Sequence, residues 1–490
     1  MDYKIPQTMK NIYIILFTIL ATLLFSCSEG FLDKKPHDAV ASSQAITTMN
    51  DAEVALNGVY SGLKAGSAYG RLLTVLPDVM TDAALASVGY TNQLGEMYKY
   101  NYVPGTGEVS NIWARGYNTI ARANNIINSI DGIEGEQSEK DNLKGQALFA
   151  RAIAHFDMVR LYAKAYDPAN ATSTKGIPYI KETKLGSPER DNVDLVYTEI
   201  INDLNQAKPL IQDAGSPTPE SYDYFTKASC DALLARVYLT MQDYDNAVEY
   251  AENVIQDYSF SLIDDQAEYA SMWLNDEGSE IIWRVKFTPT DIGGSPGYNY
   301  YNDAQGPPSP DYQPAEWILN LYDQANDFRY EVYFHEDALT NEGWTATLVD
   351  KYPTNPLFTD NGANMPKVFR LPEQYLIAAE AHAELDNDGL AMGYLNDLRA
   401  TRIAGYTDES LTGNALKDAI WDERIKELAY EGHYWFDLKR KGMGFTRTPQ
   451  ANTFTANDLS VPSDNFRWQW PIPQDEINAN ENMVQNNGYN

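Results

Sequence analysis

The sequence has few of the residues on which covalent, metal-held or cofactor-based frameworks depend. Its 490 residues include two cysteines, Cys27 and Cys230, and five histidines without mutual ligand spacing: His37, His155, His335, His382 and His433. A zinc site is therefore not expected. The chain also has no Gly-x-Ser-x-Gly elbow and no glycine-rich phosphate loop, so nothing in the sequence calls for a catalytic or cofactor site.

Positive charge is scarce as well. The chain carries 37 lysines and arginines against 69 aspartates and glutamates, which gives a formal net charge of −32. A surface this acidic repels nucleic-acid phosphates and anionic lipid headgroups. We therefore exclude nucleic acid as a partner.

Only one long apolar run is present, from Ile12 to Phe25, and its 14 residues are fewer than the roughly 20 that a spanning helix needs. The run has the length of a signal-peptide core. It ends in Leu24-Phe25-Ser26-Cys27, which is typical of a lipobox, with a small serine before a thiol that can be acylated. The sequence predicts a lipoprotein signal peptide over residues 1–26 and a lipid on Cys27. An ordinary secretory signal with an incidental cysteine, or a retained anchor helix, is the alternative.

The remaining cysteine lies in a helical run. If Cys27 is acylated, Cys230 has no disulfide partner and behaves as a small buried hydrophobe. Stability must then come from packing. The chain after the signal is long enough for two closely packed halves, which we place at residues 27–225 and 226–490, packed as one globular unit.

Helical periodicity dominates the chain. Amphipathic runs cover residues 51–64, 111–130, 138–165 and 194–211. Residues 227–256 and 370–404 each read as a helix–turn–helix with small residues on the packing face, similar to a tetratricopeptide repeat. The sequence therefore predicts a mainly α-helical fold, with irregular loops and small β-hairpins such as one at residues 280–287.

Aromatic residues are abundant, at 34 Tyr, 16 Phe and 9 Trp. Most of them should pack between helices. Two irregular segments, residues 66–104 and 287–314, are nevertheless rich in tyrosine without any period. Because tyrosine and tryptophan offer a flat apolar face with a polar edge, these segments are candidates for a ligand-binding surface.

Four ordered segments in the C-terminal half resemble the SusD/RagB family of nutrient-capture lipoproteins of Bacteroidetes-type bacteria. They are Ser279 to Phe287 followed by Asp327-Phe328-Arg329, then Val368 to Arg402, Ile420 to Arg440, and the tail from Trp470-Pro471-Ile472-Pro473 to Tyr489. In the third segment His433 stands where the family commonly has Arg. Residues 113–125 and 150–162 extend the resemblance to the N-terminal half.

The resemblance implies a SusD-like fold with tetratricopeptide-like helix pairs, attachment to the outer membrane by a lipid, and exposure to the cell exterior. Glu29 and Asp33, just after the acylation site, fit an acidic export signal. It also implies a partner, a SusC-like TonB-dependent β-barrel transporter, and a captured oligosaccharide. Peptide capture as in RagB-like proteins, and a scaffold that binds only protein, are the other two hypotheses.

If the ligand is a glycan, aromatic rings should stack on sugar C–H faces while amides and carboxylates bond the hydroxyls. The predicted ligand-binding residues are those of the two aromatic loops and the residues nearest to them: Tyr90, Asn92, Tyr98, Tyr298, Tyr300, Tyr301 and Trp317. Two acidic pairs, Asp78 with Asp82 and Asp276 with Glu277, are the places to look for a hidden glycosidase. Residues 386–389 resemble the start of a calcium loop but lack its bidentate Glu, so a polar turn is expected.

Overall fold

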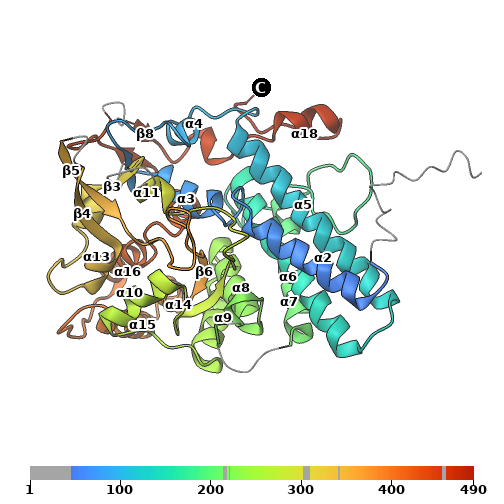
Figure 1. Cartoon of the computed structure of the whole chain (residues 1–490), viewed down its shortest axis with the longest axis horizontal. Helices are drawn as coiled ribbons and strands as arrows, with labels where there is room; N and C mark the ends of the chain where they lie inside the picture. The colour runs from blue at the N-terminus through green and yellow to red at the C-terminus, as the bar shows by residue number, and fades with distance from the viewer. Residues whose placement is uncertain are drawn as a thin grey trace, which may run out of the picture.

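The computed structural model describes residues 46–212, 218–219, 221–301, 310–339, 343–454 and 459–489. The predicted signal peptide and Cys27 lie outside these ranges. The fold is mainly α-helical, which confirms the predicted class (Figure 1). None of the helices in the described ranges is both long enough and apolar enough to cross a membrane.

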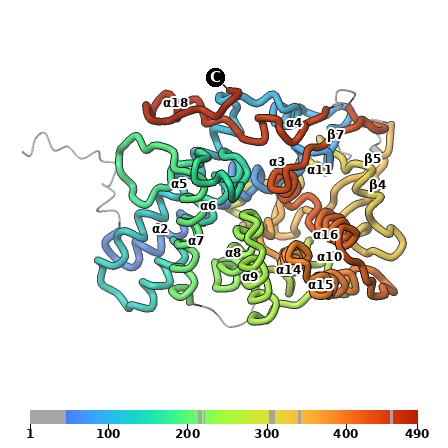
Figure 2. Tube along the Cα trace, turned by 180° about the vertical axis from the view of Figure 1, so that it is seen from behind, coloured from blue at the N-terminus to red at the C-terminus, as the bar shows by residue number. Residues whose placement is uncertain are grey.

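Four long helices form the N-terminal part of the molecule: α2 (Met49–Lys64), α5 (Gly107–Ser129), α6 (Gln137–Tyr162) and α7 (Val193–Leu210). They lie side by side in both views (Figures 1 and 2), and α6 is buried over most of its length. Helix α2 begins with a capping box, because the hydroxyl of Thr48 accepts the Asp51 N–H and the carboxylate of Asp51 accepts the Thr48 N–H.

Two helix pairs carry the predicted tetratricopeptide-like pattern: α8 (Lys227–Met241) with α9 (Tyr244–Asp257), and α14 (Leu371–Glu384) with α15 (Asp388–Ala400). Both predicted helix–turn–helix units are thus confirmed. Buried alanines of α8, α9 and α14 form a shared small-residue core, which lets the helix axes approach closely: Ala235, Ala247, Ala251, Ala378 and Ala381.

The turns within these pairs use left-handed residues. Gln242 has φ 62° and Asp386 has φ 59°, and each ends the first helix of its pair. Asp243 then caps α9 by accepting the N–H of Asn246. The predicted polar turn at 386–389 is confirmed in part, since Asp386 and Asn387 lie between the helices while Asp388 and Gly389 begin α15. Helices α16 (Gly413–Glu427) and α17 (Tyr434–Arg440) follow the second pair.

Short elements connect and cover this helical frame. The helical ones are α3 (Leu72–Val79), α4 (Gly95–Tyr98), α10 (Gln266–Asn275), α11 (Tyr298–Tyr301), α12 (Glu316–Leu319), α13 (Phe328–Tyr333) and α18 (Gln474–Ala479), with 3₁₀ turns at Ile130–Gly132, Ser221–Asp223 and Phe466–Trp468. The C-terminal tail lies over the start of α5 (Figure 1), where the indole N–H of Trp113 donates to Glu476 at 3.3 Å.

The strands of the described ranges form two-stranded antiparallel sheets. They pair as β1 (Ala84–Ala86) with β3 (Tyr312–Pro314), β2 (Ile281–Arg284) with β6 (Lys367–Arg370), β4 (Phe334–Leu339) with β5 (Trp344–Val349), and β7 (Phe445–Arg447) with β8 (Leu459–Val461). The prediction of a local hairpin at residues 280–287 is wrong. Ile281 pairs instead with Arg370, far along the chain, so β2 is joined to the segment that leads directly into α14.

One main hydrophobic core runs through both halves, from Ile46 to Met483. Beside it lies a buried ion network centred on Glu427. Its carboxylate accepts from Arg329 at 2.9 Å, Arg370 at 2.9 Å and Arg402 at 3.1 Å. Arg402 also pairs with Glu280 at 2.6 Å, and all of these side chains are at most 1 % exposed.

Two further arginines also join neighbouring segments to carboxylates. Arg399 pairs with Glu423 at 2.6 Å, and Arg424 pairs with Asp437 at 2.8 Å. These pairs cross between helices instead of following one helix face. The network therefore fixes tertiary contacts, which surface pairs within a helix cannot do.

Candidate ligand-binding site

An open cleft of about 680 Å³ lies where three segments of the chain meet. The segments are the loop between α2 and α3 with the start of α3, the residues from Gln93 to the first turns of α5, and the loop before α11. The lining residues are Gly66, Ser67, Arg71, Leu72, Gln93, Leu94, Gly107, Glu108, Asn111, Gly294, Ser295 and Tyr298. This volume matches that of typical small-ligand sites.

Glycines bring two of these loops into direct contact. A Cβ on Gly70 or on Gly293 would fall on the carbonyl oxygen of Lys64, so only glycine fits at either position. The ammonium of Lys64 also pairs with the carboxylate of Asp291 across the same junction. The edge of the cleft is therefore a close backbone crossing between segments more than 200 residues apart.

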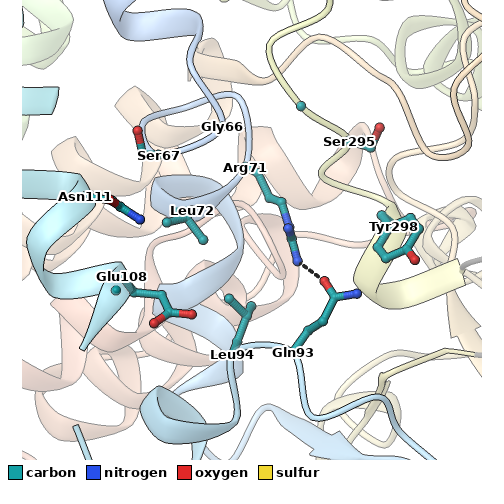
Figure 3. A pocket seen from close by; sticks show the side chains of 12 residues that line it. Gly66, Ser67, Arg71, Leu72, Gln93, Leu94, Glu108, Asn111, Ser295 and Tyr298 are labelled. Carbon is teal, nitrogen blue, oxygen red and sulfur yellow. Dashed lines mark hydrogen bonds between the residues drawn. The ribbon is translucent and has the colours of Figure 1, made fainter. Parts of the chain in front are cut away.

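Arg71 is the one cation among the lining residues of the cleft. Its Nη2 donates to Gln93 Oε1 at 2.5 Å (Figure 3). Its Nε donates to Asn299 Oδ1 at 3.0 Å. The guanidinium carbon lies 5.9 Å from the centre of the Tyr298 ring. Burial lowers the pKa of Arg71, and nearby carboxylates, Asp311 first among them, oppose that shift.

The wall on the other side of Arg71 is polar. Glu108 and Asn111 lie on the first turns of α5 and face the cleft, while Tyr298 and Ser295 stand across from them (Figure 3). A carboxylate, two amides, a guanidinium and a phenol ring thus surround one open space. This set offers hydrogen-bond donors and acceptors around a flat apolar face.

Tyr298 is the predicted ligand-binding residue that lines this cleft. Tyr90 and Asn92 lie in the same loop as Gln93 but outside the lining. The Tyr90 hydroxyl donates to Asn92 Oδ1 at 3.0 Å, and Lys99 donates to the same oxygen at 2.8 Å. Asn92 is exposed and has φ 64°. These two residues are therefore close in sequence to the cleft without forming its surface.

Tyr98 and Tyr300 lie in the core, which corrects their selection as ligand-facing rings. Tyr98 is 1 % exposed and the guanidinium of Arg447 covers its ring at 3.7 Å. Tyr300 is 0 % exposed and packs edge-on against Tyr430. Neither ring has a face on which a sugar could stack.

Tyr301 and Trp317 are half-buried outside the cleft. The ring of Tyr301 packs against the β4–β5 hairpin. The indole N–H of Trp317 donates to the carbonyl of Asp82 at 3.0 Å, and its ring lies 5.9 Å from that of Tyr434. The structure thus does not gather the seven predicted residues at one place.

The sequence analysis missed Arg71, Gln93, Glu108 and Asn111. For Arg71 and Gln93 the sequence did offer a signal, because both lie within the tyrosine-rich segment 66–104, between the predicted helices. Glu108 and Asn111 fall on the polar face of an amphipathic helix, where acidic and amide residues are ordinary. Only the folding of α5 against this segment shows that they face a cleft.

The acidic pairs proposed for a hidden glycosidase lie outside the lining of the cleft. Asp78 is buried, accepts the Gly432 N–H at 2.7 Å, and has its pKa raised by burial to about 8. Asp276 is buried and bonds Lys367 at 2.5 Å and Asn355 at 2.6 Å. Among the described residues no group of three His, Cys, Asp or Glu side chains is placed to hold a metal ion.

A helical scaffold with an open, polar cleft of this kind defines a ligand-binding protein. Two family models match the chain: the SusD family over residues 333–489, and a family described as starch-binding associating with outer membrane over residues 30–239. Between them they cover most of the chain.

Known relatives are similar to this chain along nearly its full length. SusD-like protein P2 of Formosa agariphila is 26 % identical, over 97 % of this chain and 99 % of its own. A SusD superfamily protein from Bacteroides thetaiotaomicron superposes with a TM-score of 0.80 at 27 % identity, covering 90 % of this chain and all of that one. A second, from Bacteroides vulgatus, gives 0.79 at 27 % identity, covering 91 % of this chain and all of that one.

The chain belongs to the SusD family. Its relatives are SusD-like proteins, one of them named as a starch-binding protein, and one of the two family models is described as associating with the outer membrane. The family assignment predicted from the residues, and the non-catalytic class that goes with it, are thereby confirmed.

Proposed function

We propose that this protein captures oligosaccharides in the cleft beside Arg71 and Tyr298 and delivers them to a SusC-like TonB-dependent transporter. The observation that carries the proposal is the composition of the cleft. A tyrosine ring for stacking lies within one open space with a guanidinium, two amides and a carboxylate that can bond hydroxyl groups (Figure 3).

The relatives support a sugar ligand. Starch-binding protein SusD of Bacteroides thetaiotaomicron is 35 % identical over a stretch that covers 25 % of this chain. The family model that matches residues 30–239 is likewise described as starch-binding. This kinship and the chemistry of the cleft both support oligosaccharide capture by the present chain.

Attachment at the cell surface is part of the proposal. The lipobox sequence ending at Cys27 supports acylation of that thiol and anchoring in the outer membrane, with the protein facing the cell exterior. Two acyl chains hold a protein at a membrane stably without a spanning helix. The acidic residues Glu29 and Asp33 support export to the outer face.

Affinity electrophoresis of the full chain, purified in a non-ionic detergent, through gels containing different polysaccharides tests the proposal. We expect retardation by at least one polysaccharide, with no new reducing ends. The substitution Tyr298→Ala should lower affinity at least tenfold with little change in melting temperature, because the lost ring face contacts ligand and not core.

Tyr224→Ala is the matched control, since Tyr224 is 45 % exposed and lies outside the lining of the cleft. It should leave retardation unchanged. Equal losses for both variants would show that the site is elsewhere. Retardation by no polysaccharide, with binding of peptides instead, would overturn the glycan ligand, and release of reducing ends would overturn a purely binding role.

A further inference from the structure

We propose that the cleft selects acidic glycans, and that the guanidinium of Arg71 binds a carboxylate or a sulfate group on the sugar. This inference rests on the proposed function and names the class of ligand. It comes from the partners of Arg71, which are neutral, in a chain with nearly twice as many acidic as basic residues.

Arg71 is held on one side only. Its Nε and Nη2 donate to the amide oxygens of Asn299 and Gln93, and within the described ranges no carboxylate oxygen lies within 4.0 Å of the guanidinium. The structure gives Nη1 no hydrogen-bond partner among the residues it describes. Because Arg71 lines the open cleft, that side of the guanidinium faces the space that a ligand would enter.

Two other arginines without a carboxylate partner, Arg447 and Arg190, have their donors satisfied by enclosing acceptors. Arg447 donates to the backbone carbonyls of Val79, Thr81 and Tyr98. Arg190 donates to three carbonyls and to the Asn486 side chain. Both are enclosed by these acceptors, whereas Arg71 has two neutral acceptors and an open side. A cation left in this state can form a strong bond with an incoming anion.

A buried carboxylate fixes the geometry behind Arg71. Asp311 is 1 % exposed and accepts from Asn299 Nδ2 at 3.2 Å and from the Thr91 N–H at 2.7 Å. With its NH₂ group turned to Asp311, Asn299 presents its oxygen to Arg71. The guanidinium plane is therefore held in a fixed orientation, as planar recognition of a carboxylate or sulfate requires.

The charges that face Arg71 set a limit on the ligand. Asp311 lies behind Asn299, and Glu108 stands on the far wall of the cleft (Figure 3). Glu108 would repel a second anionic group placed beside the first. The arrangement thus fits a sugar chain with a single charged group at Arg71 and uncharged neighbours, one of which stacks on Tyr298.

The test compares ligands that differ only in charge. Oligogalacturonate is compared with its carboxyl-reduced form, and carrageenan oligosaccharide with its desulfated form, each titrated into the full chain in a non-ionic detergent. We expect at least one acidic ligand to bind ten times more tightly than its uncharged counterpart. That ratio should shrink as salt is raised from about 0.02 M to about 0.5 M, because screening weakens the ion pair.

The substitution Arg71→Gln should abolish this preference, and Arg71→Lys should restore it only in part, because lysine lacks the planar fork. Arg467→Gln is the matched control. Arg467 also lacks a carboxylate partner within 4.0 Å among the described residues, lies over the Phe466 ring and not in the cleft, and changes net charge equally. It should keep the preference.

The affinities for the charged and uncharged ligands decide between the possible outcomes. Preference for only one of the two acidic ligands identifies the charged group as carboxylate or sulfate. Equal affinity for charged and uncharged forms, or a preference that survives Arg71→Gln, overturns the inference and leaves glycan capture standing. Binding of neither ligand in either form overturns the inference, and the proposed function is then judged by the polysaccharide gels alone.

Discussion

Arginine side chains have different roles in the ion network around Glu427 and in the cleft around Arg71. In the network, Arg329, Arg370 and Arg402 share one carboxylate and are at most 1 % exposed. In the cleft, Arg71 meets two neutral amides and open space. The comparison indicates that the partners of an arginine, more than its presence, distinguish a structural ion network from a candidate binding site.

The ion network and the cleft also differ in how strongly their charged groups depend on one another. Burial alone would raise the pKa of Glu427, but the guanidinium groups of Arg402, Arg370 and Arg329 hold it well below its usual range. Removing one partner there leaves another charge buried without compensation. Among the residues that the structure describes, Arg71 has no charged partner that its removal would leave buried without compensation, because its acceptors are uncharged amides and the cleft is open.

The largest effect is expected from breaking the network. Arg370→Met should lower the free energy of unfolding by about 3–5 kcal/mol, because Glu427 and Glu431 both lose a buried cation. Urea unfolding followed by circular dichroism measures the change. A loss of less than about 1 kcal/mol would mean that the network is not a stability element.

A smaller, pH-dependent effect is expected from Asp78, which lies on α3 between the two regions. Burial raises its pKa to about 8, against about 3.9 in an unfolded chain. The folded protein therefore keeps the proton more readily, and the stability that this contributes is complete below pH 4 and lost as pH rises toward 8.

Asp78→Asn removes this titration and retains an acceptor for the Gly432 N–H. The variant should gain about 1–3 kcal/mol over the wild-type protein at pH 8 and much less at pH 5. Melting temperatures at both values test this. A gain that is equal at the two pH values would show that Asp78 is charged in the folded protein.

The smallest effect on stability is expected from Arg71 itself. Arg71→Met removes two hydrogen bonds to neutral amides that water in the open cleft can replace, so the free energy of unfolding should fall by no more than about 1 kcal/mol. Urea unfolding beside Arg370→Met makes the comparison direct. Equal losses for the two variants would remove the distinction between network and cleft.

The helical frame could be predicted because its signals are local. The segments that form α2, α5, α6 and α7 carry apolar residues at helical spacing. The turns at Gln242 and Asp386 are marked by short polar stretches between two helical segments. Family motifs then placed these elements in a known fold. Local periodicity and resemblance together gave the architecture.

Contacts between distant segments could not be predicted in the same way. Residues 280–287 look like half of a hairpin, yet β2 finds its partner in β6 through pairing that no local pattern encodes. Tyr98 and Tyr300 lie in the same tyrosine-rich segments as Tyr90 and Tyr298, and no sequence period in these segments distinguishes buried from exposed rings. Arg71 is a single residue whose importance depends on Asn299, Gln93 and Tyr298 around it.

The glycine crossing at Lys64 has a consequence for the thermodynamics of capture. Gly70 and Gly293 bring two loops into backbone contact, and Lys64 with Asp291 closes the same junction. Loops fixed in this way have little conformational entropy left to lose when a ligand arrives. The walls of the cleft are thus preorganised, so a ligand that binds there would not have to order these loops first.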